Sequence, residues 1–402
     1  METFDFDEEV NRRAVPALKT HPMVLGQGGE HLFAAGVADM DFKAPPVVLQ
    51  AMQQRLDHGV FGYEAVPEAL FPALTDWLKT RHGWQVDTQH ILRAPNVLNS
   101  LAIAVSLFSG PGEGVIVQPP VFFDFYDILR ENDREIVRNP LVLQDGRYEM
   151  DFAGLERLAA DPANRILLLC NPHNPVGRVW SPQELRRMGQ ICARHDVLVV
   201  SDEIHGDITF SGHRYTPFAA LGEEFAENAI TCISPAKSFN IASCCSAFTI
   251  VSNAERRQTF QAENSRLTVN KNNAFASVAM LAAYARGGPW LDAVLTCLEK
   301  NLALVRRYIA PLAEVELIEP EGTFLVWLDF RKTGLTPDDL IAFLRRKAGW
   351  AVTRGQAFGP EGEGFVRLNI ACRHAVLEQA LQRLVQNVSH AKHFSAKGLK
   401  SQ

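Results

Sequence analysis

The chain has 402 residues and a mass of 44.7 kDa, which predicts about two or three domains with a core large enough to need no disulfides. A net charge of −6 gives no basic surface for nucleic acid, so we expect no nucleic-acid partner. No apolar run reaches the ~18 residues of a membrane helix, and the acidic start (residues 1–9) is unlike a signal peptide. The seven cysteines form no C-x-x-C pair, and most lie in apolar stretches. Together these features predict a cytoplasmic protein that does not associate with membranes.

In chain order, residues 1–45 show little periodicity and end at the turn-forming sequence Ala44-Pro45-Pro46. Short apolar runs then alternate with amphipathic helical patterns. One helix is well marked, because Ser181, Pro182 and Glu184 suit its cap, its first position and a capping box. The expected strands are Val115–Gln118, Arg165–Cys170, Val197–Ser201, Ala229–Ile233 and Phe248–Val251. This pattern predicts an α/β domain built on a mainly parallel sheet.

The last quarter of the chain has a different order of elements. A helical pattern from Pro289 to Ala313 precedes two strand-like runs, a helix capped at Thr336, the strand Phe365–Ile370 and a final helix over His374–Val388. We therefore predict a large domain over residues 46–288 and a smaller α+β domain over residues 289–390. Residues 1–45 are expected to join the small domain, and residues 391–402 to form a disordered tail.

Several common sites are absent from the sequence. It contains no G-x-G-x-x-G, G-x-x-x-x-G-K-[ST], H-E-x-x-H or G-x-S-x-G motif, and its twelve histidines show no metal-ligand spacing. Dinucleotide, P-loop and serine-nucleophile chemistry are therefore excluded, and no metal is expected.

Three consecutive strands instead run into polar residues. Asn174, Asp202 and Lys237 follow the second, third and fourth expected strands, so a parallel sheet would bring them to one edge. Each alone has an ordinary explanation, as part of a turn, as a cap or as a solvated lysine. Together they suit pyridoxal 5′-phosphate (PLP), which needs an amine for a Schiff base and a carboxylate beside its ring nitrogen. It also needs a donor to its phenolic oxygen.

The strings N-P-x-N-P-x-G (171–177), S-D-E-I-H (201–205) and S-x-x-K-S-F-N (234–240) resemble those of fold-type I PLP enzymes of the class I/II aminotransferase superfamily. More narrowly, they resemble the cystathionine β-lyase, or C–S lyase (MalY/PatB-type), branch. The resemblance runs from Val37–Phe42 to Phe365–Cys372, nearly the whole chain. It implies an aspartate-aminotransferase-like large domain, a smaller α+β domain, and a homodimer with shared active sites.

The resemblance also implies roles for the residues around the ring. Lys237 would bind PLP and act as the catalytic base, which requires a pKa below the usual ~10.4 of lysine. Asp202 would pair with the ring nitrogen, Asn174 would donate to the phenolic oxygen, and His205 would lie against the cofactor. For His205 a neutral imidazole with a purely structural role is the alternative.

Further roles implied by the resemblance concern the phosphate and the substrate. Val97 and Leu98 begin a helix whose N–H groups would bind the phosphate, with the hydroxyls of Ser234 and Ser238. Tyr63 would reach the phosphate and substrate of a partner subunit, unless it is an ordinary half-buried aromatic residue. The remaining assignments are ring stacking for Phe122 and substrate binding for Ala38 and Arg367, the latter through the α-carboxylate unless it pairs with an acid in the protein.

The function implied is α,β-elimination from cystathionine or a related cysteine S-conjugate, which yields a thiol, pyruvate and ammonia. The substrate would be a small amino acid. An aminotransferase on the same scaffold is the first alternative, and a regulator that acts by binding another protein is the second. Three departures from the branch bear on the substrate: Gly36 replaces an aromatic residue, Phe122 replaces a tyrosine, and Ser243-Cys244-Cys245 replaces a glycine-rich run.

Overall fold

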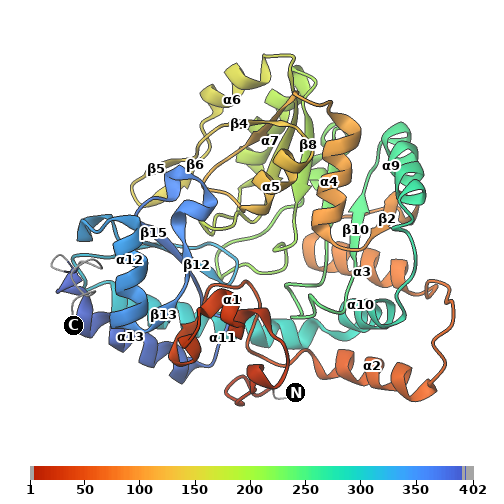
Figure 1. Cartoon of the computed structure of the whole chain (residues 1–402). Helices are drawn as coiled ribbons and strands as arrows, with labels where there is room; N and C mark the ends of the chain where they lie inside the picture. The colour runs from red at the N-terminus through yellow and green to blue at the C-terminus, as the bar shows by residue number, and fades with distance from the viewer. Residues whose placement is uncertain (1–3, 392–393, 395–402) are drawn as a thin grey trace.

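The computed structural model describes residues 4–391 and Phe394 (Figure 1). Its α-helices are α1 (Pro22–Leu25), α2 (Pro46–His58), α3 (Leu70–His82), α4 (Val97–Phe108), α5 (Asp124–Glu131), α6 (Phe152–Ala159), α7 (Pro182–Arg194), α8 (Glu223–Glu227), α9 (Ala254–Arg266), α10 (Ala274–Arg286), α11 (Gly288–Ile309), α12 (Pro337–Phe343) and α13 (His374–Val388). Its strands are β1 (Phe33–Ala34), β2 (Ile91–Ala94), β3 (Gly114–Val117), β4 (Glu135–Arg138), β5 (Val142–Gln144), β6 (Arg147–Glu149), β7 (Asn164–Cys170), β8 (Leu198–Asp202), β9 (Ala229–Ile233), β10 (Ala247–Ile250), β11 (Glu316–Ile318), β12 (Leu325–Asp329), β13 (Trp350–Ala351), β14 (Thr353–Arg354) and β15 (Phe365–Asn369).

A seven-stranded sheet with the order β2-β10-β9-β8-β7-β3-β4 forms the centre of the larger part. Strands β4, β3, β7, β8 and β9 are parallel, whereas β10 is antiparallel to both of its neighbours, β9 and β2. The prediction of a mainly parallel α/β sheet is thus confirmed. All five strands expected in this region form, with shifts of at most one residue at either end.

Strand β7 shows why its sequence is apolar without alternation. Ile166 and Leu168 face one buried cluster, whereas Leu167 and Leu169 face the other, so both sides of the strand are covered. A strand that is buried on both faces needs apolar residues at successive positions. The following helix, α7, begins with the predicted capping box: the Ser181 hydroxyl accepts a hydrogen bond from the Glu184 amide, and the Glu184 carboxylate accepts one from the Ser181 amide.

The second sheet is antiparallel, with the order β11-β12-β15-β14. The long helix α11 leads from the large sheet to this part and packs against α13 (Figure 1). The N-terminal segment contains short helical turns, and its strand β1 pairs in parallel with β13 near the second sheet. The domain limits at residues 45, 288 and 390 stay predictions.

The C-terminal end of the described chain packs against the second part. Ala391 is buried, and the Phe394 ring lies edge-on to Phe343 with 5.6 Å between centroids. The other residues of the predicted tail, 391–402, lie outside the described residues.

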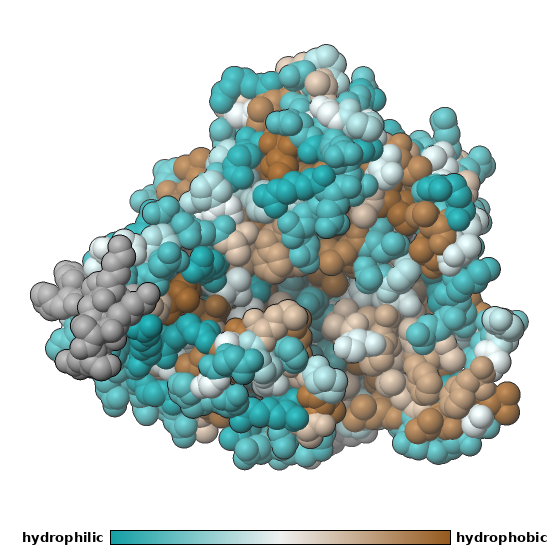
Figure 2. All heavy atoms as spheres, viewed as in Figure 1, coloured by the Kyte–Doolittle hydropathy of each residue, from teal (hydrophilic) through white to brown (hydrophobic). Residues whose placement is uncertain are grey.

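Apolar surface gathers over helix α2 and the segment that follows it, near α10 (Figures 1 and 2). The exposed side chains there include Leu49, Leu56, Val60, Phe61 and Tyr63. Within residues 4–391 and Phe394, no helix is both long enough and apolar enough to cross a membrane.

Candidate active site

The carboxyl ends of β7, β8 and β9 open into a cavity of about 340 Å³, a size typical of small-molecule pockets. Ligands of open α/β sheets bind at this edge, because the loops that leave parallel strands diverge there. The cavity brings together nine residues that the sequence predicted to form the site. They are Ala38, Val97, Leu98, Phe122, Asn174, Asp202, His205, Ser234 and Lys237.

Asn174 is placed by the turn that follows β7. Gly177 makes this turn possible, because its φ of +74° is in the left-handed region and an added Cβ would lie 2.6 Å from the Cβ of Pro320. The Asn174 side chain is buried at the cavity wall.

Lys237 lies in the loop after β9, and its Nζ donates a hydrogen bond to the carbonyl of Ala38, 2.7 Å away. Burial lowers the pKa of the Lys237 amine, and the charge of Arg367 lowers it further; Asp39, Asp202 and the Cys245 thiol act in the opposite direction. A lysine with a lowered pKa has a larger unprotonated fraction at neutral pH. It therefore meets the requirement for both a Schiff-base amine and a general base.

Asp202 is the last residue of β8 and is buried. One of its carboxylate oxygens accepts a hydrogen bond from the Ile204 amide at 3.1 Å, but no cation among the described residues lies within ion-pair distance of it. Burial raises the pKa of Asp202 to about 7. A protonated ring nitrogen bound beside Asp202 would supply the missing positive charge.

His205 is buried at the cavity wall, where its ring contacts Phe324 edge-on. Burial, together with the charges of Lys237 and Arg367, holds the pKa of His205 well below its usual value, so the imidazole is neutral. Its Nδ1 is buried and has no hydrogen-bond partner among the described residues. A backbone-satisfied structural histidine would have such a partner, so this observation favours a ligand-facing role.

Arg367 comes from β15 of the second sheet and is buried beside the cavity. Its Nη1 donates to the side-chain oxygen of Asn174 at 2.9 Å and its Nη2 to the carbonyl of Gly36 at 2.7 Å. Its Nε is buried without a partner, and no described carboxylate forms an ion pair with it. Burial lowers the pKa of Arg367 to about 9. A buried guanidinium without an ion-pair partner can bind an anion. The contact of Arg367 with a substrate carboxylate stays a prediction.

Helix α4 points its N-terminus at the cavity. Asn96 caps the helix by accepting a hydrogen bond from the Asn99 amide at 2.8 Å. The amides of Val97 and Leu98 begin the helix, where no intrahelical acceptor exists. The positive end of the helix therefore provides N–H donors for an anion such as phosphate.

The two predicted serines differ in position. The Ser234 hydroxyl lines the cavity and donates to the Ser246 carbonyl at 2.8 Å. Ser238 does not line the cavity, because its buried hydroxyl donates to the Asp207 carboxylate at 2.6 Å. Its hydroxyl proton is committed to Asp207, and the contact of Ser238 with the phosphate stays a prediction.

Tyr63 also lies outside the cavity, in the segment between α2 and α3. Its side chain is fully exposed, so the alternative of a half-buried aromatic residue is wrong for the single chain. A contact with a partner subunit's site stays a prediction.

Sequence reasoning missed several residues of the cavity wall. Asp124, the first residue of α5, carries a half-buried carboxyl near Lys237 and Arg367, and burial raises its pKa. Asn96, Cys170 and Ser246 also line the cavity. An acid directly after the Phe122-Phe123 pair was a signal in the sequence, but only the fold shows that it faces the lysine.

The chain is also similar to known proteins. Residues 32–384 match the family model described as "Aminotransferase class I and II". The chain belongs to this family. It is 42% identical to "Cystathionine beta-lyase PatB" of Bacillus subtilis over 349 residues, which are 87% of this chain and 90% of the relative. It is 32% identical to "Protein MalY" of Escherichia coli, with 96% of this chain and 99% of that protein covered.

A solved structure agrees with these relatives. Cystalysin from Treponema denticola, which contains a pyridoxal 5′-phosphate cofactor, superposes with a TM-score of 0.92 at 32% identity, covering 97% of this chain and all of that chain. The fold is therefore the aspartate-aminotransferase-like fold type I, and the chain is a PLP-dependent enzyme.

The residues present fit this cofactor. The amine of Lys237, the carboxylate of Asp202, which lacks a cation, and the helix start at Val97 line one cavity. They match the aldehyde, ring nitrogen and phosphate of PLP in charge and in hydrogen-bonding character.

Proposed function

We propose that the protein is a PLP-dependent C–S β-lyase, which cleaves cystathionine or a related cysteine S-conjugate to a thiol, pyruvate and ammonia. The observation that carries the proposal is that a lysine of lowered pKa in the cavity lies near Arg367, a buried guanidinium that forms no ion pair among the described residues. These groups are the base and the carboxylate site that removal of an α-proton from an amino acid requires. The 42% identity to a protein named as a cystathionine β-lyase supports the choice of reaction.

The residues divide the work as follows. When bound, PLP withdraws electrons from the α-carbon of an amino acid joined to it. Asp202 keeps the ring nitrogen protonated, and Arg367 binds the α-carboxylate of the substrate. The neutral imidazole of His205 adds no positive charge beside Lys237.

Lys237 moves the proton. Its unprotonated amine takes the α-proton, and the β-carbon–sulfur bond breaks with its electron pair leaving on sulfur as a thiolate. The three-carbon remainder takes up water and yields pyruvate and ammonia, so no external oxidant or 2-oxo acid is consumed. Phe122 lines the cavity with an apolar ring face suited to stacking.

The decisive experiment is incubation of the holoenzyme with L-cystathionine and PLP, without any 2-oxo acid. Release of thiol, pyruvate and ammonia over many turnovers supports the lyase. A single equivalent of oxo acid, with the cofactor trapped as its amine, would show an aminotransferase. The absence of both products would count against the lyase and favour the role of a protein-binding regulator.

We further infer that the enzyme is a cytoplasmic homodimer. The exposed apolar residues of α2 and the following segment, Leu49, Leu56, Val60 and Phe61, support a subunit interface that includes Tyr63. The seven cysteines all lie in the described part of the chain and none forms a disulfide, which agrees with a reducing compartment. Sedimentation equilibrium tests the dimer.

A further inference from the structure

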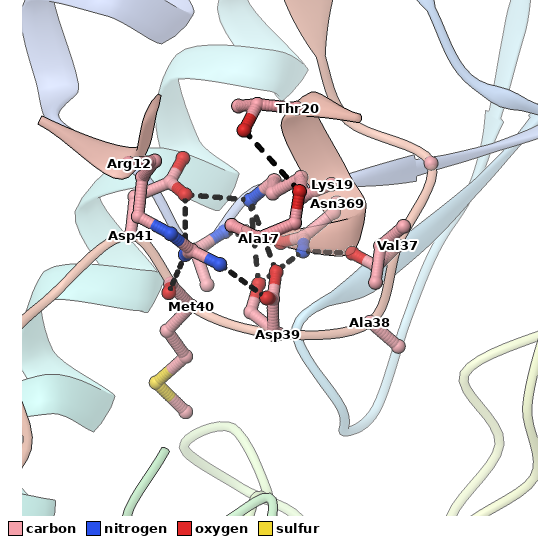
Figure 3. Close-up of polar contacts among 12 residues, drawn as sticks. Arg12, Ala17, Lys19, Thr20, Val37, Ala38, Asp39, Met40, Asp41 and Asn369 are labelled. Carbon is pink, nitrogen blue, oxygen red and sulfur yellow. Dashed lines mark hydrogen bonds and ion pairs between the residues drawn. The ribbon is translucent and has the colours of Figure 1, made fainter. Parts of the chain in front are cut away.

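Residues 36–42, which we call the strap, lie between β1 and α2, and the carbonyl of strap residue Ala38 accepts a hydrogen bond from Lys237. Figure 3 shows several polar contacts of the strap. Five successive strap carbonyls, from Gly36 to Met40, each accept a hydrogen bond from a side chain that is distant in sequence. The donors are Arg367 and Thr353 to Gly36, Asn369 to Val37, Lys237 to Ala38, Asn369 and Lys19 to Asp39, and Arg12 and Asn240 to Met40. A segment without regular secondary structure is thus fixed by side chains from three separate regions of the fold.

The N-terminal segment contributes two of the cations that contact the strap, Lys19 and Arg12. Lys19 is almost fully buried, and its Nζ lies 2.9 Å from the Asp41 carboxylate and 3.6 Å from that of Asp39. Arg12 reaches the same two carboxylates and lies 3.0 Å from Asp41 (Figure 3). A lysine is rarely buried unless it is paired, and here two cations balance two carboxylates.

The strap connects this charge cluster to the catalytic amine. Ala38, whose carbonyl accepts the hydrogen bond from Lys237 at 2.7 Å, is directly followed by Asp39 in the chain. The position of the Ala38 carbonyl is therefore determined by the contacts on either side of it. Asp39 also acts on Lys237 through space, because its negative charge favours the protonated amine.

We propose that Lys19 and Arg12 are positioning residues for Lys237, which hold the strap so that the Ala38 carbonyl binds the free amine and which neutralise the carboxylates beside it. The proposal rests on the proposed function only in taking Lys237 as the base. A lyase and an aminotransferase share that step.

The expected direction of the effect follows from the charges around the amine. Arg367 and the neutral His205 face Lys237 together with Asp39, Asp124, Asp202 and the Cys245 thiol. Removal of Lys19 leaves one negative charge of the strap uncompensated, which raises the pKa of Lys237. A smaller fraction of the amine is then unprotonated at neutral pH, so proton abstraction becomes slower there and recovers at higher pH.

The test is exchange of the α-proton of L-alanine in D₂O, followed by NMR with the holoenzyme across a pH series. Alanine has no β-leaving group, so exchange reports the base alone. In Lys19→Met we expect the acid limb of the profile to move up by about half a unit to one unit at low salt. The rate at neutral pH then falls by about 3- to 10-fold, and added salt reduces the shift.

Matched variants separate charge from structure. Lys43→Met removes the same charge close to the strap, but Lys43 is exposed and pairs with Glu8, so its profile should match wild type. The double variant Lys19→Met/Asp41→Asn restores the charge balance, so the midpoint of its acid limb should return to the wild-type pH. Lys19→Arg keeps the charge, so its midpoint should stay at the wild-type pH.

A second readout does not depend on turnover. In the cofactor-free full chain, the rate at which added PLP forms its Schiff base depends on the unprotonated amine of Lys237. Stopped-flow absorbance should show the same upward pH shift in Lys19→Met. A rate that falls equally at every pH, with the midpoint unchanged in both assays, would overturn the proposal.

The variant Arg12→Met gives the same test if Lys19→Met does not fold. Failure of the wild-type enzyme to exchange the α-proton of alanine at any pH would instead contradict the role of Lys237 as the base. In that case the proposed function itself fails, before the role of Lys19 is reached.

Discussion

The guanidinium of Arg367 donates to the side-chain oxygen of Asn174 across 2.9 Å, and this contact joins strand β15 of the second sheet to the turn after β7 of the first. Asn174 lines the cofactor cavity, whereas Arg367 carries the only charge in the pair. One hydrogen bond therefore couples the cofactor cavity to the arginine that we propose binds the substrate carboxylate.

We expect substrate binding to weaken when the guanidinium group of Arg367 is replaced. In Arg367→Lys the single ammonium cannot form two parallel hydrogen bonds to a carboxylate, and the contact with Asn174 weakens. We expect kcat/KM for cystathionine to fall by about 10- to 100-fold, since a hydrogen bond to a charged group contributes about 1.5–3 kcal/mol. Steady-state kinetics measure this.

The matched control for Arg367 is a conservative change at another buried arginine. Arg178 pairs with Glu184 and Glu321 away from the cavity, so Arg178→Lys should lower stability and leave KM unchanged. Equal KM values for Arg367→Lys and wild type would contradict the carboxylate site.

Lys237→Ala should abolish both the Schiff base and the reaction. The variant lacks the amine, so the imine absorbance of the wild-type holoenzyme should be missing from its spectrum. Elimination should fall by at least about 10²- to 10⁴-fold, the usual contribution of a general base. A wild-type spectrum in Lys237→Ala would show that another lysine binds the cofactor.

Asp202 predicts a specific pH dependence for the cofactor-free protein. Its pKa in the folded chain, about 7, is above the usual 3.8, so between these values the folded state holds a proton that the unfolded state has lost. Asp202 therefore makes the free energy of unfolding decrease as pH rises from about 4 to 7, by at most about 4 kcal/mol.

Asp202→Asn removes this contribution. The free energy of unfolding of the cofactor-free variant, relative to that of wild type, should therefore be higher at pH 8 than at pH 5. Urea unfolding at the two pH values measures the difference. The holoenzyme of the same variant should lose most of its activity, because the ring nitrogen loses the carboxylate that keeps it protonated. A constant stability difference between variant and wild type would argue against a raised pKa.

We expect alanine substitutions of Ser238 and Ser234 to affect different properties, namely stability for Ser238 and PLP binding for Ser234. Ser238→Ala takes a hydrogen-bond donor from the buried Asp207, so we expect the free energy of unfolding to fall by about 1–3 kcal/mol with PLP affinity unchanged. Ser234→Ala, at the cavity wall, should weaken PLP binding more than Ser238→Ala does. Fluorescence titration with PLP and urea unfolding distinguish them, and a PLP defect confined to Ser238→Ala would favour a phosphate contact for Ser238 after all.

Variants of Tyr63 test whether each active site contains residues from both subunits. Tyr63→Ala and Lys237→Ala subunits should each be nearly inactive, and mixing them should restore part of the activity, because a hybrid dimer contains one intact site. Activity is measured after subunit exchange has been confirmed by mass spectrometry. No recovery after confirmed exchange would place Tyr63 outside the partner's site.

Much of the site could be predicted from local sequence, because the sheet carries it. The apolar runs of β7, β8 and β9 specify parallel strands, and the residue that follows or ends each run must then reach the same edge. The strand pattern alone therefore predicts that Asn174, Asp202 and Lys237 lie together. Strands β1, β2, β4, β5, β6, β13 and β14 were missed, since two to four residues carry too little pattern.

The sequence by itself determined the identity of the chemical groups, because residue type and periodicity set an amine and an acid at or after strand ends and an arginine within a strand. Only the tertiary structure decided which partner each polar group takes. Ser238 donates to Asp207, Arg367 forms no ion pair with any described residue, and Lys19 is buried against Asp39 and Asp41 in a segment that has almost no periodic pattern. The physical reason is that hydrogen bonds and burial depend on groups brought together from distant parts of the chain, and their energies depend on the surroundings that the complete fold creates.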